Sequence, residues 1–195
     1  AAVVQSRELL WNLALRSLRT KYRRSFLGWA WSLLNPLATV AVYSFVFGTL
    51  FRSSPPVGDP SGIDLFAFYM LTGLLPWQFF MAVSSGGMGA MIGNAALIRK
   101  VAFPREALVL AEVVQASVQF AIEMALLTVV IAIFGSVYVL ATLPLTLLLM
   151  LLLAVFATGI ALMLAAVSVY FRDPAYLWTI VPQRWFFATP IVYTA

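Results

Sequence analysis

The 195-residue sequence contains no cysteine, no histidine and only seven acidic residues. Without cysteine there are no disulfides or thiol nucleophiles, and without either residue the common zinc and haem ligands are missing. Phosphate-loop, metalloprotease and serine-hydrolase motifs are absent too. The acids outside the apolar segments are too few for a paired-carboxylate or metal site. We therefore expect no enzyme activity, no bound metal and no cofactor in this chain.

Charge of either sign is scarce. Charged residues make up 10% of the chain and hydrophobic residues 63%, whereas about a quarter of a soluble domain is normally charged. The mean hydropathy is +0.99. No charged residue occurs from position 124 to position 171, a stretch too long for one membrane crossing. The composition therefore predicts an all-α integral membrane protein.

Charges and turn-forming residues divide the chain into apolar segments of at least the roughly 20 residues that a crossing needs. We predict five membrane spans, over residues 29–51, 65–93, 107–134, 145–171 and 175–195. Gly135 to Pro144 is then the turn between the third and fourth spans. No soluble domain remains, so residues 1–195 form a single transmembrane domain.

Residues 6–24 form a basic, amphipathic segment before the first span. Trp11, Leu15 and Leu18 recur at helical spacing, and Arg16 and Arg19 lie on the opposite side. This pattern predicts an interfacial helix whose cations face lipid phosphate. Ordinary anchoring by positive charge and a substrate-handling role both remain open.

The distribution of lysine and arginine predicts a cytoplasmic N-terminus. With that orientation ten cations lie on the cytoplasmic side and one, Arg52, lies outside. Arg184 falls inside the fifth predicted span and is not counted. The net charge of +5 is thus explained by topology and anionic lipid, and nucleic-acid binding is not expected.

The third predicted span carries a polar stripe formed by Glu112, Gln115, Gln119 and Glu123, which share one helical face. Charged side chains inside a membrane are costly, so this face is not expected to meet lipid. It serves either as interhelical hydrogen-bonding contact or as part of a conduit for a hydroxyl-rich substrate.

Four sequence blocks carry a resemblance to a known family. They are Lys21 to Pro36 (KYRRSFLGWAWSLLNP), Leu71 to Trp77 (LTGLLPW), Asn94 to Glu106 and Tyr170 to Asp173 (YFRD). In the same order, they resemble blocks of type-2 ABC exporter permeases for polysaccharides, the family of O-antigen, teichoic-acid and capsule permeases. Together they extend over nearly the whole chain.

The resemblance implies a permease subunit with six membrane helices, five of them visible here, in the bacterial plasma (inner) membrane. It implies pairing with a second copy and with two cytoplasmic ATPase subunits, which carry ATP and Mg. Because the family has outward-side re-entrant helices and a sixth crossing after the fifth span, the sequence is expected to be C-terminally incomplete.

The resemblance also assigns roles to individual residues. The interfacial helix corresponds to a gate helix whose cations meet the pyrophosphate of a lipid-linked glycan, and residues 94–106 correspond to the segment that couples to the ATPase. Aromatic rings along the conduit hold the moving sugar chain. The implied residues are Arg16, Arg19, Arg23 and Arg24 for the gate; Leu97, Ile98, Arg99, Lys100, Phe103 and Arg105 for coupling; and Tyr43, Phe45 and Trp178 for the conduit.

We therefore expect the permease of an ATP-driven exporter for lipid-linked polysaccharide. One alternative is a related permease for a smaller lipid or drug. A second is an ATP-independent secondary transporter or channel that uses Glu112 and Glu123 as a proton or cation site. Residues 94–106 also have a simpler interpretation, as a solvated basic loop.

Overall fold

The computed structural model describes residues 66–95, 98, 104–134, 138–171, 173–189 and 191, together with Trp11, Leu15, Leu34, Leu37, Ala38, Ala41, Val42, Phe45 and Val46. Within these ranges the chain forms helices and no strands. The helices are α4 (Phe66–Gly93), α6 (Glu106–Phe134), α7 (Tyr138–Ala141), α8 (Leu143–Tyr170) and α9 (Asp173–Ala188).

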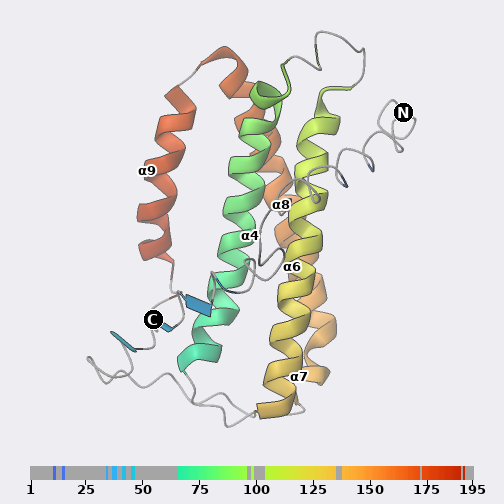
Figure 1. The fold of residues 1–195 in the computed structure, drawn as a ribbon, viewed down its shortest axis with the longest axis vertical. Helices are drawn as coiled ribbons and strands as arrows, with labels where there is room; N and C mark the ends of the chain where they lie inside the picture. Colours follow the sequence, from blue (N-terminus) through green and yellow to red (C-terminus); the bar gives the residue numbers. More distant parts are fainter. Residues whose placement is uncertain are drawn as a thin grey trace.

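Helix α4 is the centre of the bundle, with α6 and α8 packed along it and α9 beside it (Figure 1). The chain reverses direction between successive long helices. As a result, the end of α4, the start of α6, the end of α8 and the start of α9 lie at one end of the bundle (Figure 1). Helix α7 lies at the opposite end (Figure 1).

Small residues join α4 to α8. Ala157, Ala161, Leu164, Ala165 and Ser168 form the buried face of α8, at the spacing of one helical side. A Cβ atom on Gly87 would lie 2.7 Å from the Cβ of Ala161, so the two backbones approach as closely as this glycine allows. Such small-residue contacts let helices in membranes pack tightly without a hydrophobic driving force.

The outward side of α8 is apolar and uncovered. Leu147, Leu151 and Val155 are 61%, 62% and 66% exposed. By length and composition, two stretches of the described chain qualify as membrane-crossing helices, Glu106–Ile133 and Leu143–Tyr170, with mean hydropathies of 2.1 and 2.8. A face this apolar is compatible with lipid or another subunit and not with water.

Three boundaries differ from the sequence predictions. The predicted turn at Gly135 to Pro144 contains the one-turn helix α7, and Pro144 belongs to the first turn of α8, where its missing N–H needs no partner. Helix α9 begins at Asp173, two residues before the predicted span, and ends at Ala188 instead of residue 195. Pro190 accounts for that end, because proline disfavours a helical conformation in the residue before it. At 16 residues, α9 is about 24 Å long, less than the ~30 Å hydrocarbon thickness.

Candidate functional site

The polar stripe on α6 is turned toward the inside of the bundle. Gln115 and Glu123 are buried, with 7% and 6% of their surfaces exposed. Gln119 Nε2 donates a 2.8 Å hydrogen bond to Glu123 Oε1 one turn away. The carboxylate of Glu112 lies over Gly86 of α4, with Oε2 3.6 Å from where a Cβ would stand. Gln115 and Glu123 are thus removed from the surface of the subunit, whereas Glu112 and Gln119 are half-buried.

Aromatic rings from three helices meet halfway along the bundle, and we call Trp77, Phe80, Phe156, Trp185 and Phe186 the aromatic layer. Phe80 stacks on Phe156 with centroids 6.0 Å apart and meets Trp185 edge-on at 5.7 Å. Trp77 lies 5.6 Å from Phe186. Tilted and edge-on pairs of this kind stabilise packing beyond the area they bury.

The aromatic layer marks the middle of the bundle. Phe80 is the fifteenth of 28 residues in α4, and Phe156 is the fourteenth of 28 in α8. Because Trp185 contacts Phe80, the same level of α9 lies beside the centre of both long helices. The sequence shows these aromatics but not this convergence, which depends on contacts between residues far apart in the chain.

Trp178 belongs to the interior of the subunit. Its Nε1 donates a 3.2 Å hydrogen bond to the Oγ of Ser84 on α4, and Ser84 in turn donates to the carbonyl of Phe80 at 2.7 Å. Its indole packs between α9 and α4, and its N–H donor is used there. Trp178 is only partly buried, so its role in a conduit stays a prediction.

Two cavities adjoin the half of α4 that begins at Phe66. One, of about 430 Å³, lies between α4, α8 and α9 and is lined by residues that include Trp77, Phe156 and Trp185. The other, of about 320 Å³, lies between α4, α6, α7 and α8. Thr72, Pro76 and Leu153 contribute to the walls of both cavities.

The threonines in these walls offer few free donors. Their hydroxyl groups donate to carbonyls three or four residues earlier in the same helix, at 2.7 to 3.1 Å. The bonds run from Thr72 to Tyr69, Thr128 to Met124, Thr142 to Val139, Thr146 to Thr142 and Thr189 to Trp185. Each hydroxyl proton is satisfied locally, so the cavities present mainly apolar surface and acceptor oxygens. They suit hydrocarbon or the faces of rings better than an anion.

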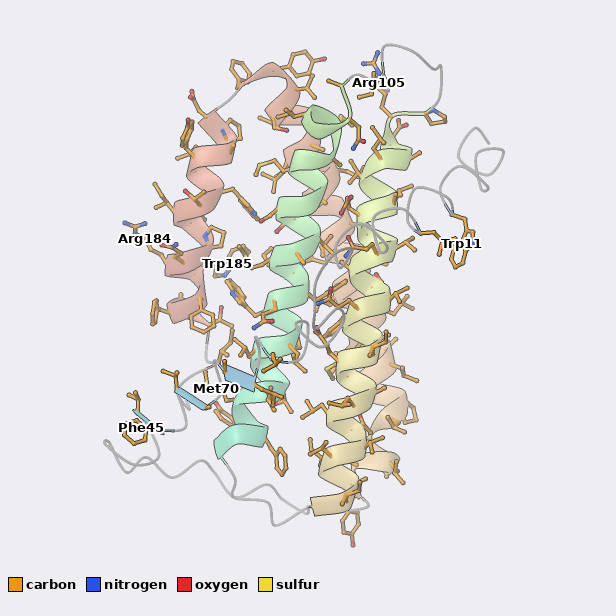
Figure 2. All side chains as sticks on the ribbon, in the orientation of Figure 1. Trp11, Phe45, Met70, Arg105, Arg184 and Trp185 are labelled. Carbon is orange, nitrogen blue, oxygen red and sulfur yellow. The ribbon has the colours of Figure 1, made fainter. Side chains whose placement is uncertain are left out.

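The predicted coupling segment is described only in part. Ile98 continues a helical turn from Asn94 and packs partly buried against the hydrophobic core. Arg105 is exposed at the end of the bundle where α6 begins (Figure 2). An exposed cation at a helix-bundle end is available to a partner, whereas Ile98 also holds the segment against its own subunit.

Several predicted residues lie outside the described part of the chain. They are Arg16, Arg19, Arg23 and Arg24 of the gate helix, Tyr43 of the conduit, and Leu97, Arg99, Lys100 and Phe103 of the coupling segment. Phe45 is described and 60% exposed. Among the residues that the structure describes, no three histidine, cysteine or carboxylate side chains come together as a metal site would require.

One polar side chain of α9 is not among the site residues that the sequence predicts. Arg184 is exposed on α9, and its Nη1 donates a 3.4 Å hydrogen bond to the carbonyl of Ile180. Figure 2 shows its side chain on the side of α9 that faces away from α4, whereas Trp185 points toward α4. A cation inside an otherwise apolar predicted span is the signal by which the sequence could have identified it.

Known proteins resemble this chain over almost all its length. Residues 8–195 match the family described as ABC-2 type transporter. The O-antigen export system permease protein RfbA of Myxococcus xanthus is 34% identical over 191 residues, which are 97% of this chain and 69% of the relative. A protein of that name from Klebsiella pneumoniae is 26% identical over 188 residues, covering 96% and 70%. The polysialic acid transport protein KpsM of Escherichia coli is 24% identical over 183 residues, covering 93% and 68%.

Proposed function

Because the chain belongs to the ABC-2 type transporter family, we propose that it is the permease subunit of an ATP-driven polysaccharide exporter. The observation that carries this proposal is the match over residues 8–195 together with relatives named for O-antigen export and polysialic acid transport. Both cargoes are cell-envelope glycans. The proposed cargo is therefore a lipid-linked polysaccharide of this class, and the location is the plasma (inner) membrane.

The difficulty of this task is to carry a polar chain across ~30 Å of hydrocarbon. The two cavities described above, of about 430 and 320 Å³, are too small to enclose such a chain. We propose that two copies form a homodimer and that the glycan passes between them. Polar and aromatic side chains on that path replace the water that the sugar hydroxyls leave behind.

The cytoplasmic end is proposed to be the end at which α4 and α8 finish and α6 and α9 begin. The sequence between these helices contains Arg99, Lys100, Arg105 and Arg172, whereas none of residues 135–142 is charged. This asymmetry supports a cytoplasmic N-terminus by the positive-inside rule. Five spans and a gate helix at residues 6–24 belong to the same proposal.

Energy is proposed to come from two cytoplasmic ATPase subunits, which bind ATP and Mg and dock on residues 94–106. The permease itself then undergoes no covalent chemistry. Its part is to convert closure of the ATPase pair into a change of the path between protomers, and the small-residue contact of α4 with α8 provides a stiff connection for this purpose.

Reversal of charge at Arg105 tests the coupling. The full-length permease is co-purified with its ATPase, reconstituted in lipid, and assayed for ATP turnover with and without lipid-linked glycan. We expect Arg105→Glu to reduce the glycan-stimulated turnover at least several-fold, because an acidic side chain at an exposed interface repels the partner surface that arginine attracts. Arg105→Lys is the matched control, which keeps the charge and is expected to retain most of the stimulation.

The outcomes separate the alternatives. Stimulation by a small lipid or drug, without any response to glycan, would assign the chain to a permease for smaller cargo. Failure to associate with any ATPase, together with proton or cation flux that Glu112→Gln abolishes, would replace the exporter by a secondary transporter or channel.

A further inference from the structure

Arg184 lies level with the middle of the bundle. It is eleven residues beyond Asp173, the first residue of α9, and so about 17 Å from that end at 1.5 Å per residue. The next residue, Trp185, has its ring 5.7 Å from that of Phe80, which is at the midpoint of α4. Both measures place the arginine level with the middle of α4, and the export function proposed above puts that level inside the hydrocarbon layer, ~30 Å thick.

The face of α9 around Arg184 is apolar, and none of the described residues covers it. Four exposed apolar side chains lie on this face, three before Arg184 and one after it. Their exposed fractions are 59% for Leu177, 46% for Ile180, 45% for Val181 and 65% for Phe187. Within the described part of the chain, the guanidinium donates one hydrogen bond, from Nη1 to the carbonyl of Ile180 at 3.4 Å. An arginine on such a face cannot be left in lipid, so it meets another part of the protein, another subunit or an aqueous path.

Carboxylates in the described chain lie elsewhere. Glu123 is bonded to Gln119 on α6, and Glu112 lies over Gly86 of α4. Asp173 is the only acid in α9, three turns away. In a two-fold dimer whose axis runs along the bundle, the two copies of Arg184 lie at the same level, and they face each other where this part of α9 lies at the axis. Two cations facing each other in a low-dielectric region are stable only with an anion between them.

We propose that Arg184 is an anion-binding site on the wall of the translocation path, halfway across the membrane. Its ligand is an oxyanion carried by the exported glycan, either the diphosphate of a lipid carrier or a carboxylate of an acidic sugar. The guanidinium fork matches both groups with two parallel hydrogen bonds. This inference rests on the export function proposed above, and it adds the requirement that the cargo carries negative charge past the membrane centre.

A thiol placed one turn from Arg184 tests the site without an ATPase or a glycan. The 195 residues contain no cysteine, so Val181→Cys in an otherwise cysteine-free full-length chain reports on this face alone. In lipid nanodiscs an anionic and a cationic methanethiosulfonate reagent are compared by the rates at which they modify this thiol. We expect the ratio of the anionic to the cationic rate to be about tenfold higher than in the Val181→Cys, Arg184→Gln double variant. Focusing of charge in a low-dielectric cleft produces effects of this size.

Controls keep the result unambiguous. Leu151→Cys on the exposed side of α8 is the matched lipid-facing position and is expected to react with neither reagent. Arg184→Lys in the Val181→Cys background retains the charge and is expected to preserve the anionic preference, which covers the case in which the glutamine variant fails to fold. A Val181→Cys thiol as unreactive as Leu151→Cys, or a preference that is unchanged without Arg184, would overturn the site.

Protection of the same thiol identifies the source of the oxyanion. Geranylgeranyl diphosphate is compared with geranylgeraniol, and oligogalacturonate with maltoheptaose. Protection by the diphosphate alone assigns the lipid carrier, and protection by the acidic oligosaccharide alone assigns the sugar. Protection by none of the four compounds overturns the proposal. A wild-type protein that is dimeric and an Arg184→Gln variant that is monomeric would also overturn it, because Arg184 would then bind protein at the interface.

The two proposals fail separately. Loss of the anionic preference while glycan still stimulates ATP turnover removes the anion site and leaves the exporter. An anionic preference in a protein that no ATPase binds removes the exporter and shows that the path belongs to another kind of anion carrier.

Discussion

The two halves of α4 pack in different ways. Toward Gly93, small residues allow close contact, and Gly87 leaves no room for a side chain beside Ala161. Toward Phe66, aromatic rings fill the space, with cavities of about 430 and 320 Å³ beside them. Closely packed backbones transmit displacement, whereas large side chains next to cavities can rearrange. The difference indicates a stiff half next to the proposed ATPase and an adaptable half along the proposed path.

Removal of the ring at the centre of the aromatic layer is expected to have the largest effect on stability. Phe80 contacts Trp77, Phe156, Trp178 and Trp185. Phe80→Ala should lower the free energy of unfolding in detergent by about 3–5 kcal/mol, because it removes these contacts and enlarges a cavity. Val155→Ala, an exposed neighbour of Phe156, is the control and should change it by less than about 1 kcal/mol. Equal effects of the two variants would show that the aromatic layer does not hold the helices together.

A methyl group at the close contact should have the next largest effect. In Gly87→Ala the new Cβ would lie 2.7 Å from the Cβ of Ala161 and 3.1 Å from Val109 Cγ1, so α4 and α8 must separate. We expect a loss of about 1–3 kcal/mol, measured by thermal unfolding of the purified protein. Gly89→Ala meets nothing within 4 Å and should be neutral or slightly stabilising. A tolerated Gly87→Ala would contradict the stiff half.

Loss of the serine between the two halves should have the smallest effect. Ser84→Ala removes the hydroxyl that accepts from Trp178 Nε1, and interhelical hydrogen bonds in membranes contribute about 0.6 kcal/mol, with a maximum near 1.7. The indole fluorescence of the variant should also change, because Nε1–H loses its partner. Ser85 is exposed on the same helix, and Ser85→Ala is the matched control. Identical spectra for both variants would mean that Trp178 is not held by Ser84.

The sequence predicted the bounds of α4, α6 and α8 more accurately than those of α7 and α9. The second, third and fourth predicted segments agree with α4, α6 and α8 to within two residues, because charges and turn residues mark their ends. The fifth predicted segment contains most of α9, as far as Ala188, where Pro190 disfavours a helical conformation in the residue before it. One-turn α7 has no periodicity from which it could be recognised.

The candidate site was predicted unevenly. The burial of Gln115 and Glu123 agrees with the cost of placing such groups in lipid. The hydrogen bond of Trp178 could not be predicted, because its acceptor is Ser84, which is 94 residues away. Arg184 was visible as a cation in an apolar segment, but its direction depends on how α9 packs on Phe80 and Ser84. Contacts between distant residues, which composition does not contain, decided these cases.

Transport itself tests the central claim most directly. The full-length permease and its ATPase are reconstituted in vesicles with the ATPase outside, and lipid-linked glycan is added to the outer leaflet. The account predicts that glycan becomes protected from an external glycosidase only when ATP is hydrolysed. Protection without ATP, or no protection together with an ion flux that requires neither ATP nor the ATPase, would contradict it.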